Sequence, residues 1–161
     1  LEFSNKYWFN ILIFTQLIYG SLLIVGTVFI QVAFISTLTY CLHVLSNWLA
    51  RPPFQLKTVL ILSAMVLWLV AGLSVSAALW AGVYLVIGAF NSLEPALYFS
   101  IVTFSTLGYG DIVLEPQWRI LGSLTAVNGL IIVGLNTAVL VEAIARIRAT
   151  QHGTSGGYHL H

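Results

Sequence analysis

Charged side chains are scarce in this chain of 161 residues. Only 7% of the residues are Asp, Glu, Lys or Arg, whereas a soluble domain carries about 25%. The net charge of +1 gives no basic surface of the kind that nucleic-acid binding requires. The only cysteine, Cys41, cannot form an intrachain disulfide, and we expect it to be an inert packing residue. No residue cluster has metal-ligand spacing or pairs a nucleophile with a base, so the sequence does not predict an enzyme.

What the chain has instead is long apolar runs. Hydrophobic residues make up 59% of the sequence and the mean hydropathy is +0.96. A bilayer core of about 30 Å needs roughly 20 helical residues, and the first apolar run, residues 8–50, is about twice that length. It contains no charge and no proline, so we predict one long, tilted or bent helix. The alternative is two spans with a break near Gly20 or Gln31. A second run, residues 56–88, predicts another span.

A short helix should follow the second span. Asn91 and Ser92 interrupt the apolar run, Ser92 is a good N-cap, and Glu94 and Pro95 suit a first helical turn. The predicted helix, residues 93–104, would extend about 18 Å, which is too short to cross a bilayer. It should therefore enter the membrane and stop, and a last span should run from about Pro116 to Arg148.

The segment after the short helix, residues 103–111, reads T-F-S-T-L-G-Y-G-D. Rings of backbone carbonyls can replace the water shell of a monovalent cation. Successive carbonyls point inward only if the backbone alternates in hand, and glycine adopts positive φ at little steric cost. Gly108 and Gly110 stand at the alternate positions that this requires. The predicted ion ligands are the carbonyls of Thr106, Leu107, Gly108 and Tyr109 together with the Thr106 hydroxyl.

This segment resembles the T-x-x-T-x-G-Y-G-D motif of the tetrameric pore-loop potassium channels, and the resemblance extends over residues 56–148. The first apolar run resembles the extra N-terminal helix of some small prokaryotic members, although it has no sharp motif. Only Leu107 departs from the commonest form, which has Val or Ile. The resemblance implies an all-α membrane protein with an outer helix, a re-entrant pore helix, a selectivity filter and an inner helix. The expected parts are an N-terminal transmembrane helix and connection (1–54), the pore domain (55–148) and a disordered or non-native tail (149–161).

The same resemblance implies a homotetramer in a lipid bilayer that conducts K⁺ passively. The transported K⁺ would bind at Thr106, Leu107, Gly108 and Tyr109, with Gly110 completing the filter. Two alternatives remain open: a poorly selective cation channel on the same fold, and a non-conducting membrane subunit or sensor. No segment has the spaced Arg or Lys residues of a voltage sensor, and the sequence predicts no soluble regulatory domain within this chain.

Support for the filter is expected from Tyr98 and Asp111. In the family, the aspartate after the filter bonds to an aromatic donor on the pore helix. Tyr98 can donate through its hydroxyl, whereas Phe99 cannot donate. Val102 stands where some members have a glutamate, so Asp111 lacks that partner. The sequence therefore predicts a filter held by fewer bonds.

The candidate gate lies on the last span. Gly129 and Gly134 are hinge candidates, with close helix packing as the alternative. Asn128 and Asn136 should either face the cavity or bond between helices. Glu142 could attract cations or pair with Arg146 in the same helix. Val133, Thr137 and Val141 are expected to line the cavity.

The basic residues predict the orientation. Arg51 and Lys57 flank the first connection, and Arg146 and Arg148 follow the last span, so both groups belong on the cytoplasmic side. The filter mouth would then lie outside and the C-terminus inside. A bacterial plasma membrane is the expected location.

Overall fold

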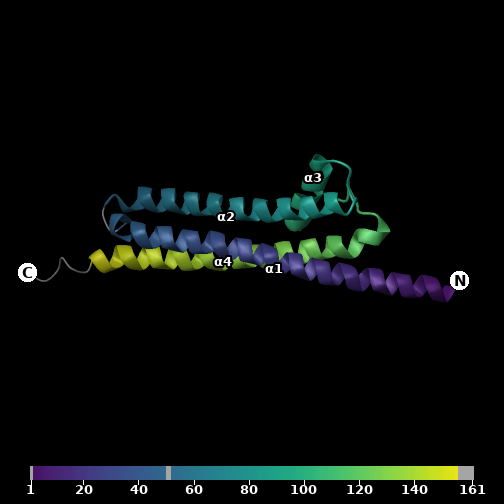
Figure 1. Ribbon diagram of the computed structural model, residues 1–161. Helices are drawn as coiled ribbons and strands as arrows, with labels where there is room; N and C mark the ends of the chain where they lie inside the picture. Colours follow the sequence, from purple (N-terminus) through teal and green to yellow (C-terminus); the bar gives the residue numbers. More distant parts are fainter. Residues whose placement is uncertain (1, 50–51, 156–161) are drawn as a thin grey trace, which may run out of the picture.

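The computed structural model describes residues 2–49 and 52–155, all in helices or short connections. The helices are α1 (Glu2–Leu49), α2 (Phe54–Val86), α3 (Leu93–Phe104) and α4 (Arg119–Ser155), and a short 3-10 helix, η1 (Pro116–Trp118), precedes α4. The long helices α1, α2 and α4 run side by side, and α3 lies at one end, against α2 and α4 (Figure 1). The described residues contain no strand, so the expected all-α fold is confirmed.

Within the described part of the chain, three stretches are long and apolar enough to cross a bilayer: Ile11–Ser46, Gln55–Val86 and Pro116–Ala149. The α3 helix is also apolar but falls short of that length. The chain is therefore an integral membrane protein. A single unbroken α1 confirms the long N-terminal helix, and no break occurs near Gly20 or Gln31. At 48 residues, α1 is about 70 Å long, and its N-terminal part extends beyond the loop end of the bundle (Figure 1).

The polar residues of α1 do not break the helix because they bond to α4. Gln31 donates from Nε2 to Oδ1 of Asn136 over 2.6 Å. Asn128 donates from Nδ2 to Oγ1 of Thr27, also over 2.6 Å. We call these two bonds, together with the bond that Gln16 accepts, described next, the polar ladder. They confirm that Asn128 and Asn136 bond between helices, a favourable use of polar groups inside a membrane.

The third bond of the polar ladder supports the start of α4. The backbone N–H of Leu121 donates to Oε1 of Gln16 over 3.2 Å. Leu121 lies in the first turn of α4, where backbone N–H groups have no partner within the helix. The side chain of Gln16, 105 residues away in sequence, therefore caps this helix.

Two apolar clusters hold the bundle together, one at each end. Near α3, the buried cluster includes Trp80, Tyr84, Phe104 and Ile132. At the opposite end, Leu38 of α1, Met65 of α2 and Ala143 and Ile147 of α4 form the second cluster. Tyr84 also bonds through its hydroxyl to Oγ1 of Thr125 over 2.6 Å, which ties α2 to α4 inside the first cluster.

The last helix ends later than the sequence predicts. It continues to Ser155 instead of ending near Arg148, so residues 149–155 are helical and not a disordered tail. Ala149, Thr150 and Gln151 are compatible with a helix, and no proline follows them to stop it. Residues 156–161 of the expected tail lie outside the described part of the chain.

Candidate functional site

The site is built on α3, whose bounds agree with the predicted 93–104. Ser92 occupies the N-cap with an extended backbone (φ −146°, ψ 158°), although its side chain makes no capping hydrogen bond. Glu94 lies in the first turn, where an acid favours the positive end of the helix. At the other end, Phe104 is fully buried and fixes the helix in the cluster with Trp80 and Tyr84.

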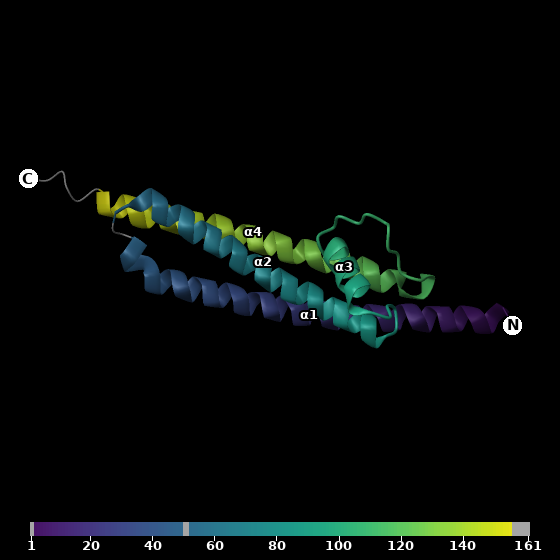
Figure 2. The same ribbon diagram turned by 90° about the horizontal axis from the view of Figure 1, so that it is seen from above.

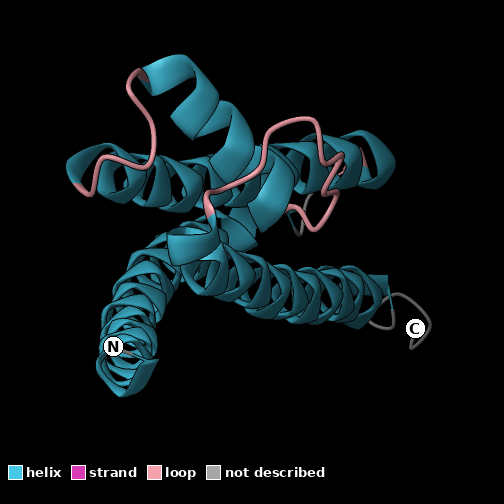
Figure 3. Cartoon of the chain, turned by 90° about the vertical axis from the view of Figure 1, so that its right-hand side faces the viewer, coloured by secondary structure: helices cyan, strands magenta, loops and turns pink. Residues whose placement is uncertain are grey.

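The loop after α3 is tied to the last turn of that helix. Thr106 donates its backbone N–H to the carbonyl of Thr103 over 2.9 Å. The N–H groups of Leu107 and Gly108 both donate to the carbonyl of Val102, over 3.0 and 3.2 Å. These bonds use carbonyls that the end of a helix leaves without partners. They hold the first half of the loop against α3, in the position seen in Figure 3.

The backbone of the loop alternates in hand. Positive φ occurs at Thr106 (59°), Gly108 (56°) and Gly110 (76°), and the intervening Leu107 and Tyr109 do not share it. The two glycines take the conformation that the sequence predicts. The sequence predicts Thr106 as an ion ligand but not its positive φ, because the left-handed region costs a threonine about 1–2 kcal/mol. The two-residue spacing from Gly108 is the signal that would have found it.

The side chains of the loop are exposed on the single chain. Tyr109 exposes 68% of its surface and Leu107 56%. Large apolar side chains gathered in this way are typical of a surface that a partner covers. We expect the Tyr109 side chain to point away from the ions and to brace the filter against surrounding aromatic residues, and this role stays a prediction that concerns neighbouring copies of the chain.

The expected bond between Tyr98 and Asp111 is present. The Tyr98 hydroxyl donates to Oδ2 of Asp111 over 2.6 Å, and the backbone N–H of Ile112 donates to Oδ1 over 3.0 Å. The hydrogen bond from Tyr98 is the main reason that the pKa of Asp111 is lowered. Asp111 thus stays ionised at neutral pH and holds the outer end of the loop to the α3 helix.

Phe99, which cannot donate a hydrogen bond, has a packing role instead. Its ring lies edge-on to Tyr84, with centroids 5.4 Å apart and planes at 83°, and it also contacts the ring of Phe90 at 5.4 Å. The α3 helix therefore has one side chain that bonds to the loop and a neighbouring one that packs against α2.

Gly129 lies where α4 passes the end of α3. A Cβ atom at this position would collide with the backbone carbonyl of Phe104, so only glycine permits this approach. At Gly134 a Cβ atom would meet nothing within 4 Å. The structure therefore supports the packing role for Gly129, and the hinge role of either glycine stays a prediction.

The other predicted residues of α4 lie on its exposed side. Val133, Thr137 and Val141 are exposed on the single chain, as cavity-lining residues would be. Glu142 accepts a 2.7 Å ion pair from Nε of Arg146, with side-chain exposures of 62% and 72%, so the pairing within α4 is confirmed. The cation-attracting role of Glu142 stays a prediction.

A comparison with known families finds one match. The family model described as "Ion channel" matches residues 58–146, which include α3, the loop and most of α2 and α4. These are also nearly the residues over which the sequence resembles a pore domain.

Curated relatives match the same kind of protein over a shorter stretch. The chain is 37% identical over 59 residues to the potassium voltage-gated channel protein Shal of Drosophila melanogaster. It is 36% identical over 59 residues to the A-type voltage-gated potassium channel KCND3 of Homo sapiens and of Rattus norvegicus. The match covers 36% of this chain and about a tenth of the length of these relatives. No solved structure matches the chain significantly.

Proposed function

Because the chain belongs to the ion-channel family, we propose that it is a potassium-selective channel subunit with T-L-G-Y-G, residues 106–110, as its filter. The observation that carries this proposal is the positive φ at Thr106, Gly108 and Gly110. Such alternation is what brings successive carbonyls to the same side of a strand of backbone, and carbonyl rings are how potassium filters replace water. The names of the curated relatives support potassium as the transported ion.

The surroundings of the filter suit a cation. The carbonyl end of α3 carries the negative end of the helix dipole, which favours a cation beside it. Asp111 adds a negative charge at the outer end of the loop, held by Tyr98. Both features favour a cation near the filter without contacting it, and the proposed direct ligands remain the backbone carbonyls and the Thr106 hydroxyl.

One chain supplies one filter segment, so the proposed pore needs several copies around an axis. We infer a homotetramer, as the family resemblance implies. The exposed side chains of the loop and the exposed stripe of α4 that includes Val133, Thr137 and Val141 are the surfaces that would face the axis or a neighbouring copy. Mass measurement of the purified protein in nanodiscs should give four chains per particle; a monomer or dimer would contradict the pore.

Ion flux into liposomes that contain the purified protein tests the function. We expect K⁺ uptake that exceeds Na⁺ uptake, that Ba²⁺ blocks, and that Gly108→Ala abolishes, because alanine disfavours φ of +56°. Gly82→Ala is the matched control, since Gly82 lies in α2 with no atom within 4 Å of an added Cβ.

Two other outcomes would favour the alternatives. Equal Na⁺ and K⁺ flux that Gly108→Ala removes would indicate a poorly selective cation channel on this fold. Absence of flux across a wide range of pH, voltage and membrane tension would indicate a non-conducting subunit or sensor.

A further inference from the structure

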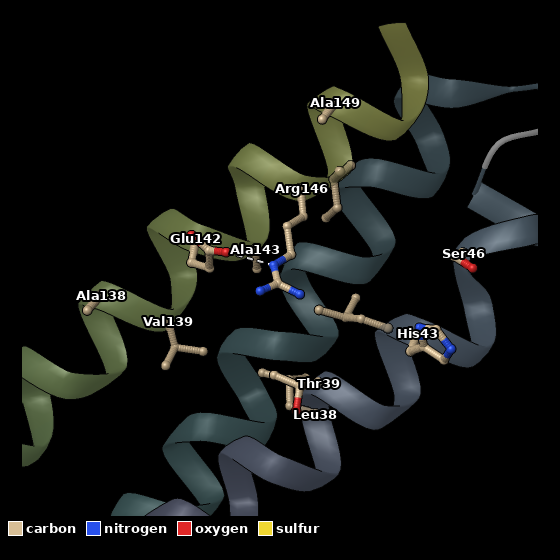
Figure 4. A pocket seen from close by; sticks show the side chains of 12 residues that line it. Leu38, Thr39, His43, Ser46, Ala138, Val139, Glu142, Ala143, Arg146 and Ala149 are labelled. Carbon is tan, nitrogen blue, oxygen red and sulfur yellow. Dashed lines mark hydrogen bonds and ion pairs between the residues drawn. The ribbon is translucent and has the colours of Figure 1, made fainter. Parts of the chain in front are cut away.

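A groove of about 560 Å³ opens between α1 and α4 at the end of the bundle away from the filter. Its walls come only from these two helices, for example Leu38 and Thr39 of α1 and Val139 of α4. Its volume lies within the range of about 300–1,000 Å³ that is typical of ligand sites. The side chains that line it are mainly apolar toward the middle of the bundle and polar toward the end (Figure 4).

The groove begins where the polar ladder ends. Gln31 and Asn136 make the last bond of the ladder, and the groove residues follow on both helices, from Leu38 on α1 and from Ala138 on α4. Figure 2 shows both helices continuing past that bond to the end of the bundle away from the filter, with α4 above and α1 below. The small side chains of Ala138 and Ala143 do not fill the gap. The cluster that contains Leu38, Ala143 and Met65 of α2 closes one side of it.

The polar end of the groove contains Arg146 and Glu142, and it lies at the end of the bundle where the described cations outnumber the acids. Arg146 extends from α4 into the opening, toward the side of α1 that carries His43 (Figure 4). Glu142 pairs with Arg146. Arg148 lies about half a turn further along α4 and does not line the groove. Lys57 lies at the same end, with its ammonium 4.3 Å from the centre of the Trp48 ring. Among the described residues at this end of the bundle, the three cations Lys57, Arg146 and Arg148 thus outnumber the one acid, Glu142.

We propose that this groove binds an anionic phospholipid, with one acyl chain between α1 and α4 and the phosphate at Arg146. An apolar groove in a membrane-spanning bundle is open to acyl chains, and basic pockets between helices at the cytoplasmic side select anionic head groups. The guanidinium matches a phosphate in both charge and geometry. The bound chain would fill the gap that the end of the polar ladder leaves and would set the spacing of α1 from α4.

Native mass spectrometry of the purified assembly, given equal amounts of phosphatidylglycerol and phosphatidylcholine, tests this site. We expect preferential retention of phosphatidylglycerol. Thr39→Trp should fill the groove and lower retention about tenfold, which corresponds to about 1.4 kcal/mol of binding free energy. Tyr40→Trp is its matched control, because Tyr40 is 70% exposed and does not line the groove.

The charge at the groove is tested separately. Arg146→Gln should also lower phosphatidylglycerol retention about tenfold, the size expected for one lost charge-assisted bond, whereas Arg148→Gln, outside the groove, should leave it within about twofold. Glu142→Gln should raise retention because it removes the acid beside the phosphate. Equal retention of both lipids, or wild-type retention by Thr39→Trp, would overturn the proposal. Thr39→Trp and Arg146→Gln both change exposed side chains. A melting temperature near that of the wild type would show that these two variants fold.

Discussion

At the scale of single residues, glycine and threonine determine the shape of the candidate filter and its contact with the inner helix. Thr106 adopts a conformation that normally favours glycine, and three backbone bonds to Val102 and Thr103 hold the loop while it does so. Gly129 in turn lets α4 touch the last carbonyl of α3. Any movement of α4 at this point would therefore act directly on the helix that carries the filter.

Gly129→Ala tests that contact. We expect a loss of about 1–3 kcal/mol of stability, the usual cost of overpacking, because the new methyl group meets the Phe104 carbonyl. Gly134→Ala should instead be neutral or stabilising by up to about 1 kcal/mol, the gain in helix propensity. Thermal unfolding of the assembly in detergent measures both. If both variants behave alike, the contact at Phe104 does not limit the packing.

Tyr98→Phe removes the hydroxyl that bonds to Asp111 and keeps the ring. We expect the current to decay faster during sustained activation, because the outer end of the loop loses a bond to α3. Recordings from planar bilayers would show this, with Phe99→Tyr as a control at the neighbouring position. An unchanged decay rate and unchanged selectivity would show that this bond does not support the filter.

The hydrogen bond between Tyr98 and Asp111 should depend on pH in a definite direction. The bond from the Tyr98 hydroxyl lowers the pKa of Asp111 from the ordinary value of 3.8. The contribution of the bond is therefore complete above that value and is lost as the pH falls through the lower folded value. The difference in decay rate between wild type and Tyr98→Phe should thus remain constant from neutral pH down to about pH 4. A difference that disappears near pH 6 would require another titrating group.

At the scale of helices, α1 and α4 form one paired unit through the polar ladder. A double-mutant cycle on Gln31→Ala and Asn136→Ala should give a coupling of about 0.6–1.7 kcal/mol, as measured for other bonds between membrane helices. Each single variant should also lower the stability, since it leaves the other side chain buried without this partner. Thr37→Ala is a control, because Thr37 is exposed and bonds only to Ala33 of its own helix. Additive effects in the cycle would mean that the bond contributes nothing.

Much of this arrangement follows from local sequence signals, and the rest does not. Asn91, Ser92 and Glu94 predict α3 to the residue because an apolar run is interrupted and restarted by residues that begin helices. Gln31 is a candidate break of the first apolar run when the sequence is considered locally, because its partner Asn136 is 105 residues away. Sequence alone likewise left Gly129 between hinge and packing, because the choice depends on how closely α3 approaches. The groove beside Leu38 has no sequence signal, since it depends on how the side chains of α1 and α4 pack against each other.

At the scale of the whole molecule, charge divides the bundle into two ends. Glu94, Asp111 and Glu115 lie near the filter with Arg119, whereas Lys57, Arg146 and Arg148 lie at the other end with Glu142. This asymmetry supports a basic end in the cytoplasm and a filter mouth outside.

Thiol labelling in whole cells tests the orientation. In a Cys41→Ser background, a membrane-impermeant maleimide should label Glu115→Cys in intact cells and label Arg148→Cys only after the membrane is opened. Both positions are exposed, so reactivity itself should not differ. The reverse labelling pattern would show that the protein has the opposite orientation in the membrane.

The polar ladder also has a consequence for how the protein is made. The ribosome produces Gln16 and Gln31 105 residues before Leu121 and Asn136, which at 5–20 residues per second is a delay of about 5–20 s. During this interval the first helix is already long and apolar enough to enter the bilayer, yet Oε1 of Gln16 and Nε2 of Gln31 lack the partners that α4 later provides. Until α4 arrives, α1 must therefore keep these groups near water or bond them to another protein, so the pairing of α4 with α1 is the step of biogenesis that satisfies them.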